Sequence, residues 1–405
     1  MKATATVLLL CLPSSLLAQS GWSAPVVVPE LNTTTSDLDA DLSFDGLTMY
    51  MAKSLGTTNW DIYVATRAAT TQPWSTPVLE AALSDPTAVD AGPCLRADGL
   101  EILFNSSRPG TGGADIWRAV RPSPSSPWGT PTEVTELNTI DAETSPSLTG
   151  NGLQVFFISN RLGGPGQSDV WTATRPNLAS PFGPAVPVTA VSAAGADRDP
   201  AISFDGLTLV HITSPSTTTR GSNLYVSRRT NPTGTFSTPT LIAELNSTQF
   251  SLAPTLSFNG NEMYFSRLFT TGSYEHMYTR FEGLTAVGYA SPSQTMTLAY
   301  RDSTAPFKTF VGALALGSTP GITLGTRTIP LNPDVLFLNS IGGIPGVATG
   351  FAGLLDANGE AGGAITMPFP QLVGLHLFAG FLTIDLNAPF GVQTISNALE
   401  IEVLQ

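Results

Sequence analysis

The sequence predicts an all-β protein: a five-bladed β-propeller followed by an antiparallel β-sandwich. The first observation is a unit of about 54 residues that recurs five times without a helical pattern, which is typical of a stacked or radial repeat protein. The second is a turn-rich composition, because the 405 residues include 38 Gly and 32 Pro and only 12% are charged. Each unit is anchored by an Asp-Gly or Asn-Gly pair, beginning at Asp45, Asp98, Asn151, Asp205 and Asn259.

Two apolar runs flank each anchor. In the first unit they are Ala40–Ser43 and Met49–Met51, and similar runs recur in the other four. Consecutive apolar positions indicate strands that are buried on both faces. The pair between them predicts a hairpin turn, because Gly tolerates a positive φ and Asp or Asn closes the turn with its side chain.

Two further strands complete the unit. The third contains an Asp-Ile-aromatic motif, such as Asp61-Ile62-Tyr63, and the fourth begins with an aromatic residue near a Pro, as at Trp74-Ser75. Proline suits an edge strand, where a missing donor costs little. Four short antiparallel strands per unit predict a propeller blade.

The order of these motifs predicts how the ring closes. The first copy of the fourth-strand motif, Trp22–Pro25, precedes every blade, while the last blade has none after Arg280. We therefore expect the segment Trp22–Val28 to pair with the last three strands and remove the open edges of a linear array. This predicts five blades, with six as the alternative if the following domain lends a degenerate blade.

The units resemble a known family. The pattern Asp-x-x-Pro-x-Leu-Ser-x-Asp-Gly, then an aromatic strand, then Asp-Ile-Tyr or Asp-Ile-Trp, is similar to the WD40-like propeller repeat of the TolB type. The resemblance covers roughly residues 22–280 and departs from the pattern at His276-Met277-Tyr278 in the last unit. It implies a scaffold for protein or ligand contacts; some such propellers occur in hydrolases whose catalytic machinery lies in another domain.

The chain divides into three predicted segments. Residues 1–18 have the pattern of a signal peptide, with a buried N-terminal strand or helix as the alternative. Residues 19–283 form the propeller, and 284–405 form a sandwich of about seven or eight strands. The last segment resembles a C-terminal module of secreted bacterial proteins, which implies secretion or surface display and no catalytic residues. We expect a secreted, periplasmic or cell-surface protein.

Charge and cysteine content exclude several classes. A net charge of −13 argues against nucleic acid and against an anionic membrane surface as partners. No segment after the signal peptide holds eighteen uninterrupted apolar residues, so we expect no membrane-spanning helix. Cys94 alone remains after cleavage, and its place in the repeat favours a packed thiol over a nucleophile.

The candidate binding residues are acidic and lie eight positions before four of the anchors: Asp37, Asp90, Glu143 and Asp197. If they converge at one rim of the channel, they could bind a cation or a basic or polyhydroxyl ligand. The alternative is that each caps its own turn, repeated because the blade is repeated. We predict no catalytic residue, metal site or cofactor, and we interpret His211 as a core histidine and Asp356–Glu360 as a hairpin turn.

Three functions remain open. The first is a non-enzymatic propeller scaffold that binds a protein or glycan partner at one rim of the channel. The second is a polysaccharide-active glycoside hydrolase with a carboxylate pair at that rim, which needs two unlike carboxylates, whereas the four candidates are near equivalents. The third is a purely structural envelope protein.

Overall fold

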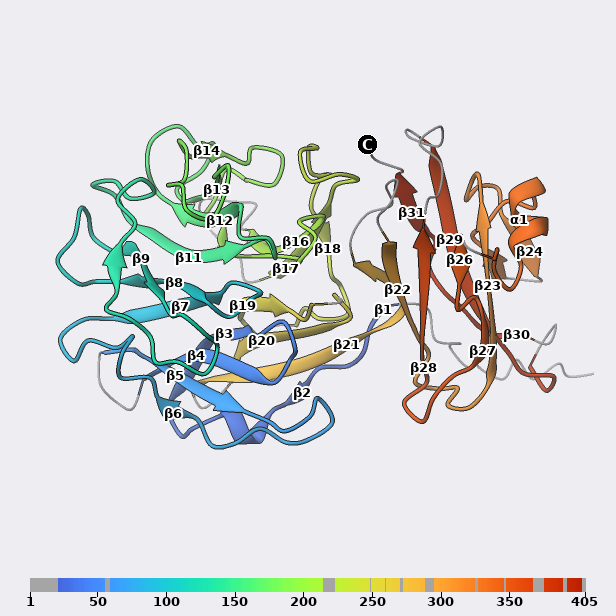
Figure 1. The fold of residues 1–405 in the computed structure, drawn as a ribbon, viewed down its shortest axis with the longest axis horizontal. Coiled ribbons are helices and arrows are strands. Elements are labelled where there is room, and N and C mark those ends of the chain that lie inside the picture. The colour runs from blue at the N-terminus through green and yellow to red at the C-terminus, as the bar shows by residue number, and fades with distance from the viewer. Residues whose placement is uncertain are drawn as a thin grey trace, which may run out of the picture.

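The computed structural model describes residues 21–54, 59–213, 223–247, 249–258, 260–269, 272–287, 295–324, 327–345, 347–366, 375–388 and 392–402. The predicted signal peptide, residues 1–18, lies outside them. Figure 1 shows a wheel of sheets beside a smaller body made of two sheets. Strands are the main regular structure of the described residues, which also contain the 3-10 turn η1 (Pro29–Leu31) and the short helix α1 (Val335–Ser340).

Each repeat forms an antiparallel sheet in which strands follow one another in chain order. The first sheet contains β3 (Ser36–Leu42), β4 (Thr48–Ser54), β5 (Asp61–Thr66) and β6 (Val78–Leu79); the second contains β7 (Asp90–Leu95), β8 (Glu101–Ser106), β9 (Asp115–Val120) and β10 (Thr132–Glu133). The third contains β11 (Glu143–Leu148), β12 (Gln154–Ser159), β13 (Asp169–Thr174) and β14 (Val186–Pro187); the fourth contains β15 (Arg198–Ile202), β16 (Thr208–Thr213), β17 (Asn223–Arg228) and β18 (Thr240–Leu241). The fifth begins with β19 (Ser251–Leu256), β20 (Glu262–Leu268) and β21 (Tyr274–Val287).

The apolar runs of the sequence become the core between neighbouring sheets. On β8, Ile102, Leu103 and Phe104 are all fully buried. Ile102 and Phe104 pack with Tyr50 and Ile62 of the first sheet, so consecutive apolar residues serve two interfaces. Most of the apolar stabilisation therefore lies between sheets rather than within them.

The sheets form a closed wheel. The first strand of each sheet contacts that of the next, from β3 through β7, β11 and β15 to β19, and β19 contacts β3 again. This arrangement confirms the all-β propeller architecture expected from the repeats. The channel at its centre is bounded by these first strands.

The N-terminal segment supplies the outer strands of the last sheet, as predicted. In β2 (Val26–Val27), Val26 pairs with Tyr278 and Val27 with Met277 on β21. In β1 (Gly21–Trp22), Trp22 pairs with Phe281 farther along β21. The two ends of the repeat region are thereby joined in one sheet.

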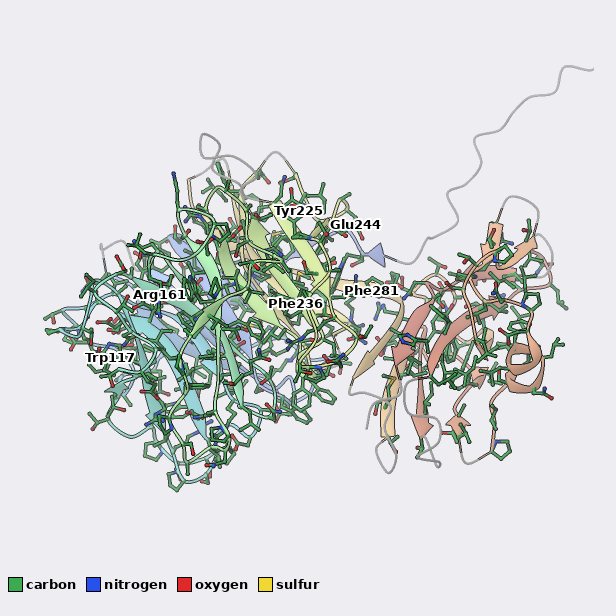
Figure 2. All side chains as sticks on the ribbon, turned by 90° about the horizontal axis from the view of Figure 1, so that it is seen from above. Trp117, Arg161, Tyr225, Phe236, Glu244 and Phe281 are labelled. Atoms are coloured by element: carbon green, nitrogen blue, oxygen red, sulfur yellow. The ribbon has the colours of Figure 1, made fainter. Side chains whose placement is uncertain are left out.

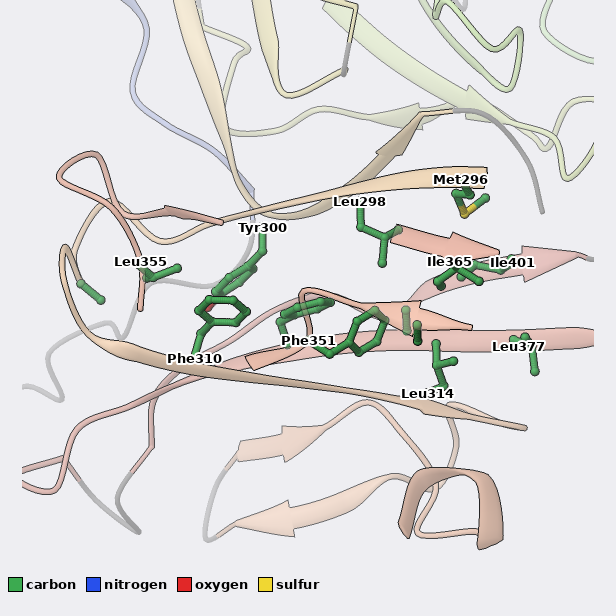
Figure 3. Packing of buried hydrophobic residues seen from close by; sticks show 14 residues of the cluster. Met296, Leu298, Tyr300, Phe310, Leu314, Phe351, Leu355, Ile365, Leu377 and Ile401 are labelled. Carbon is green, nitrogen blue, oxygen red and sulfur yellow. The ribbon is translucent and has the colours of Figure 1, made fainter. Parts of the chain in front are cut away.

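The C-terminal body consists of two facing sheets. One continues from β21 through β22 (Thr295–Arg301), β28 (Glu360–Thr366) and β26 (Ala348–Thr349). The other contains β27 (Ala352–Leu354), β23 (Thr309–Ala315), β29 (His376–Ile384), β30 (Val392–Ile395) and β31 (Leu399–Glu402), beside the hairpin β24 (Ile322–Leu324) and β25 (Arg327–Ile329). Tyr300 stacks on Phe381 with ring centroids 5.5 Å apart, inside an apolar cluster between the sheets (Figure 3).

Helix α1 was not predicted, because its sequence, Val335–Ser340, is apolar and short enough to suit a strand. The Asp334 carboxylate accepts the Phe337 N–H at 2.9 Å and satisfies one of the free donors of the first turn. This cap favours a helix at a place where the pattern of apolar residues alone is ambiguous.

Candidate binding site in the propeller channel

The four predicted carboxylates are fully buried, and each accepts a backbone N–H from the loop before its own sheet. The donors are Thr33 to Asp37 at 2.6 Å, Asp85 to Asp90 at 2.7 Å, Thr139 to Glu143 at 2.7 Å and Ala193 to Asp197 at 3.0 Å. This geometry favours the turn-capping interpretation over a binding role.

Three of these four carboxylates also have a cation from their own sheet. Nζ of Lys53 lies 2.5 Å from the Asp37 carboxylate. A guanidinium nitrogen of Arg108 lies 3.1 Å from Asp90, and one of Arg161 lies 3.1 Å from Glu143. The same cations donate to the carbonyl oxygens of the preceding loops, at Leu31, Leu83 and Leu137. Each carboxylate is thus the centre of a latch inside one repeat, and the structure does not bring the four together.

Asp197 is the exception. The residue at the place of Lys53 is Thr213, and burial raises the pKa of Asp197 to about 6. The carboxylate keeps its backbone donor from Ala193. None of the four predicted residues is among the described residues that line the channel cavity.

The cavity itself lies among the first strands of all five sheets and has a volume of about 90 Å³. Every one of these strands bulges at the same place, six residues before the anchor. The φ angles there are 53° at Asp39, 59° at Gly92, 50° at Ser145, 47° at Asp199 and 50° at Ala253. Four non-glycine residues in the left-handed region are unusual, and such strain is concentrated at functional sites.

Two of the bulge residues are acidic, and each binds the next sheet. Asp39 Oδ2 accepts the Gly92 N–H at 3.1 Å. Asp199 Oδ2 accepts the Ala253 N–H at 3.0 Å, and its Oδ1 accepts the Ser145 hydroxyl at 2.9 Å. Both carboxylates line the cavity, so they link neighbouring sheets and face the channel.

A third carboxylate lies two residues beyond the first. Asp41 accepts the Leu95 N–H at 2.7 Å and the Thr255 hydroxyl at 3.0 Å. The Thr255 contact joins the fifth sheet to the first, where the ring closes. Asp41 therefore depends on the closure of the propeller for one of its partners.

The channel disfavours the charged forms of these carboxyl groups. Burial raises the pKa of Asp39 to about 7, and the nearby Asp199 carboxylate adds to the effect. Burial likewise raises the pKa of Asp199, and it raises that of Asp41 to about 6. All three residues are half-buried and line the channel cavity.

One end of the channel has an aromatic cluster. Phe44, Phe204 and Phe258 each stand one residue before an anchor and line the cavity. Their ring centroids are 5.2 Å apart for Phe44 and Phe204, 4.1 Å for Phe44 and Phe258, and 4.9 Å for Phe204 and Phe258. The cavity thus has an apolar floor at the turn end of the strands and carboxylates along its wall.

The sequence analysis did not predict the channel carboxylates, because it compared the acidic residues eight positions before each anchor and not the residues six positions before it. Asp39 and Asp199 occupy a position that is Gly92, Ser145 and Ala253 in the other repeats. That break in symmetry was visible in the sequence and was the signal that could have found them.

The other predicted residues lie as expected. Cys94 is buried, and its Sγ accepts the Leu148 N–H at 3.1 Å, which confirms a packed thiol. Burial raises the pKa of that thiol. His211 is fully buried in β16, as expected of a core histidine, and burial lowers its pKa to about 4. Its hydrogen bonding differs from that of a satisfied core histidine, because neither ring nitrogen has a partner among the described residues. The segment Asp356–Glu360 is a turn with Gly359 at a φ of 73°.

The described residues contain no group of three or more His, Cys, Asp or Glu side chains arranged to hold a metal ion. No helix in the same part of the chain is long and apolar enough to cross a membrane.

No family model matches the chain, and no curated protein matches it. The solved structures it resembles include TolB from Acinetobacter baumannii, with 18% identity, a TM-score of 0.38, and 62% of this chain and 56% of that chain covered. A putative TolB from Agrobacterium tumefaciens is 14% identical, with a TM-score of 0.39 and coverage of 65% and 99%. A thermostable family-43 glycoside hydrolase is 10% identical, with a TM-score of 0.44 and coverage of 64% and 93%.

The chain spans 56% of the length of the Acinetobacter protein. At these identities and scores the likeness is limited to the propeller fold, and it leaves the choice between scaffold and enzyme open.

Proposed function

We propose that this protein is a secreted, non-enzymatic β-propeller that binds a protein partner at the channel, by taking a basic side chain of that partner between its carboxylates. The observation that carries the proposal is that Asp39, Asp41 and Asp199 line one cavity, although most of the other repeats have no acid at the equivalent positions. The described residues that line this cavity include no Lys or Arg. A cation from outside would therefore meet three acidic groups that have no ionic partner within the cavity wall.

The size of the cavity favours a side chain over a sugar ring. Its volume of about 90 Å³ is smaller than the roughly 150 Å³ of an engineered protein cavity that binds benzene. An ammonium or guanidinium group on a thin apolar stem fits such a space, with the charged head beside the carboxylates of the wall and the stem toward the mouth of the channel. A pyranose ring is too large to be enclosed and would have to lie across the mouth of the channel.

The raised pKa values predict how binding depends on pH. Asp39, with a pKa of about 7, carries its proton in much of the free protein at neutral pH. A bound cation stabilises the ionised form and expels that proton. Affinity for a basic ligand should therefore increase as pH rises through about 7.

The experiment is a peptide-array screen at pH 8 and pH 6 with Lys- and Arg-containing peptides and matched norleucine and citrulline peptides. We expect binding that requires the cation, is stronger at pH 8, and falls at least about tenfold in the Asp39→Asn/Asp199→Asn double variant. Glu30→Gln, a change at an exposed residue, is the control and should bind like the wild type. Equal binding by the double variant would overturn the proposal.

A glycoside hydrolase is the second candidate, and one observation favours it. Asp39 and Asp199 both line the cavity, and burial raises the pKa of both, that of Asp39 to about 7, which is the property a general acid needs. Release of reducing sugar from any member of a polysaccharide panel, abolished in Asp39→Asn and in Asp199→Asn, would replace the binding proposal with this one.

A further inference from the structure

One strand belongs to both bodies of the molecule. Residues 274–280 of β21 pair with β20 in the fifth propeller sheet, and residues 283–287 pair with β22 in the C-terminal body. Figure 1 shows the strand running from the wheel into the second body, and Figure 2 places Phe281 at their junction. The strand on which the ring closes is therefore also the first strand of the C-terminal module.

The closure depends on contacts between segments that lie far apart in the chain. The outer strands β1 and β2 have two residues each, and Val26 and Val27 are 56% and 37% exposed. Their additional backbone bonds run from the Ser23 N–H to the Arg280 carbonyl at 2.8 Å and from the Val28 N–H to the His276 carbonyl at 3.0 Å. The outer strands of the other four propeller sheets are equally short, but in those sheets all four strands are consecutive in the chain. Here Ser23 meets Thr279, 256 residues away. Closing this sheet therefore carries the largest loop-closure entropy among the propeller sheets.

A network of charged side chains supports β21 from the other body. Arg280 lies 2.6 Å from Glu262 on β20 and 3.0 Å from Glu360 on β28. Arg301 on β22 lies 2.5 Å from the same Glu360 and 3.0 Å from Glu282. All five side chains are at least 70% buried, and a partly buried network contributes more than isolated surface pairs.

We infer that the C-terminal module is a clasp that keeps the propeller closed. Through Glu360 and Arg301 it fixes the direction of β21, and β21 in turn binds the N-terminal strands. The closed seam between β19 and β3 carries the hydrogen bond from Thr255 to Asp41. The clasp therefore also positions one of the three channel carboxylates, a role beyond secretion or surface display.

The test is hydrogen exchange on the full-length Glu360→Gln variant, which removes the carboxylate shared by the two arginines. We expect the Ser23 and Val28 amides to exchange at least about tenfold faster, because the strand they bind loses its support. Amides of β12, across the ring, should keep their wild-type rates. Asp385→Asn, which breaks the 2.9 Å pair with Lys308 inside the module, is the matched control and should leave the closure unchanged.

Faster exchange confined to the C-terminal body, with wild-type rates at Ser23 and Val28, would overturn the inference. If Glu360→Gln does not fold, Arg301→Gln removes the link to Glu282 while Arg280 keeps both of its partners, and the same amides decide the outcome. Neither readout requires a channel ligand, so a failure here is distinct from a failure of the proposed binding function.

Discussion

Asp37 and Asp39 lie two residues apart on the same strand, yet their surroundings differ completely. Asp37 is bound by its own repeat, through the Thr33 N–H and the Lys53 ammonium. Asp39 stands at the bulge, where its φ is 53°, and its backbone donor is Gly92 of the next sheet. A local change of backbone direction separates an acid that supports the fold from an acid that faces the channel.

The same contrast holds between the first and fourth repeats. Asp37 has a buried cation, while its counterpart Asp197 faces Thr213, and burial raises the pKa of Asp197. The acidic residue is repeated, but its partner is not. Repetition of a side chain therefore does not imply repetition of its role, and the partner has to be identified for each copy.

The largest effect is expected from Asp37→Asn. Lys53 is 1% exposed, and burial already lowers its pKa although Asp37 opposes the shift. Loss of the carboxylate leaves a buried ammonium without its counter-ion, which costs about 3 to 5 kcal/mol. Urea denaturation at pH 7.5 measures this. Asp197→Asn is the comparison and should change the unfolding free energy by less than about 1 kcal/mol; equal losses in both variants would refute the distinction.

A smaller effect, which depends on pH, is expected for Asp39. Its pKa is about 7 in the folded protein and 3.8 ordinarily, so the folded state holds more protons between those values. The contribution of this group to the free energy of unfolding is therefore largest below about pH 4 and is lost as pH rises through about 7.

After allowance for water at its exposed edge, we expect a decrease of about 1 to 2 kcal/mol between pH 4.5 and pH 8. Asp39→Asn should flatten that slope in urea denaturation series, with Glu30→Gln as control. An unchanged slope in Asp39→Asn would show that the channel does not perturb this carboxyl.

The smallest effect is expected from Thr213→Lys. Arg198 pairs with Ile212, so Asp197 and Thr213 take the places of Asp37 and Lys53. A lysine at 213 should complete the missing latch, lower the pKa of Asp197 and add up to about 1 kcal/mol at pH 7.5. Carboxyl ¹³C titration by NMR follows the pKa. A pKa that stays near 6 would mean that the fourth repeat cannot form the latch.

Much of the fold was accessible from the sequence. The pairing of Val26 and Val27 with the last sheet followed from the position of one unpaired motif, and the structure confirms it. The candidate site was not accessible in the same way. The acidic residues eight positions before the anchors recur regularly, and that regularity suggested a ring of binding residues. A structural latch repeated in each blade produces the same regularity. The acid at the bulge is irregular, because only two of the five repeats carry an Asp there.

By itself the sequence determined the sheets and the turns between their strands, because apolar runs and Asp-Gly or Asn-Gly turns act locally and are present in every unit. It also determined how the ring closes, because one fourth-strand motif precedes the first blade and the last blade lacks one. Only the tertiary structure decided which acidic residues meet one another. Their hydrogen-bond partners lie 53 residues away for Asp39 and 54 for Asp199, on neighbouring sheets. Contacts of that range exist only after the sheets pack around the channel, and the bulge that turns these carboxylates toward it is stabilised by the same packing.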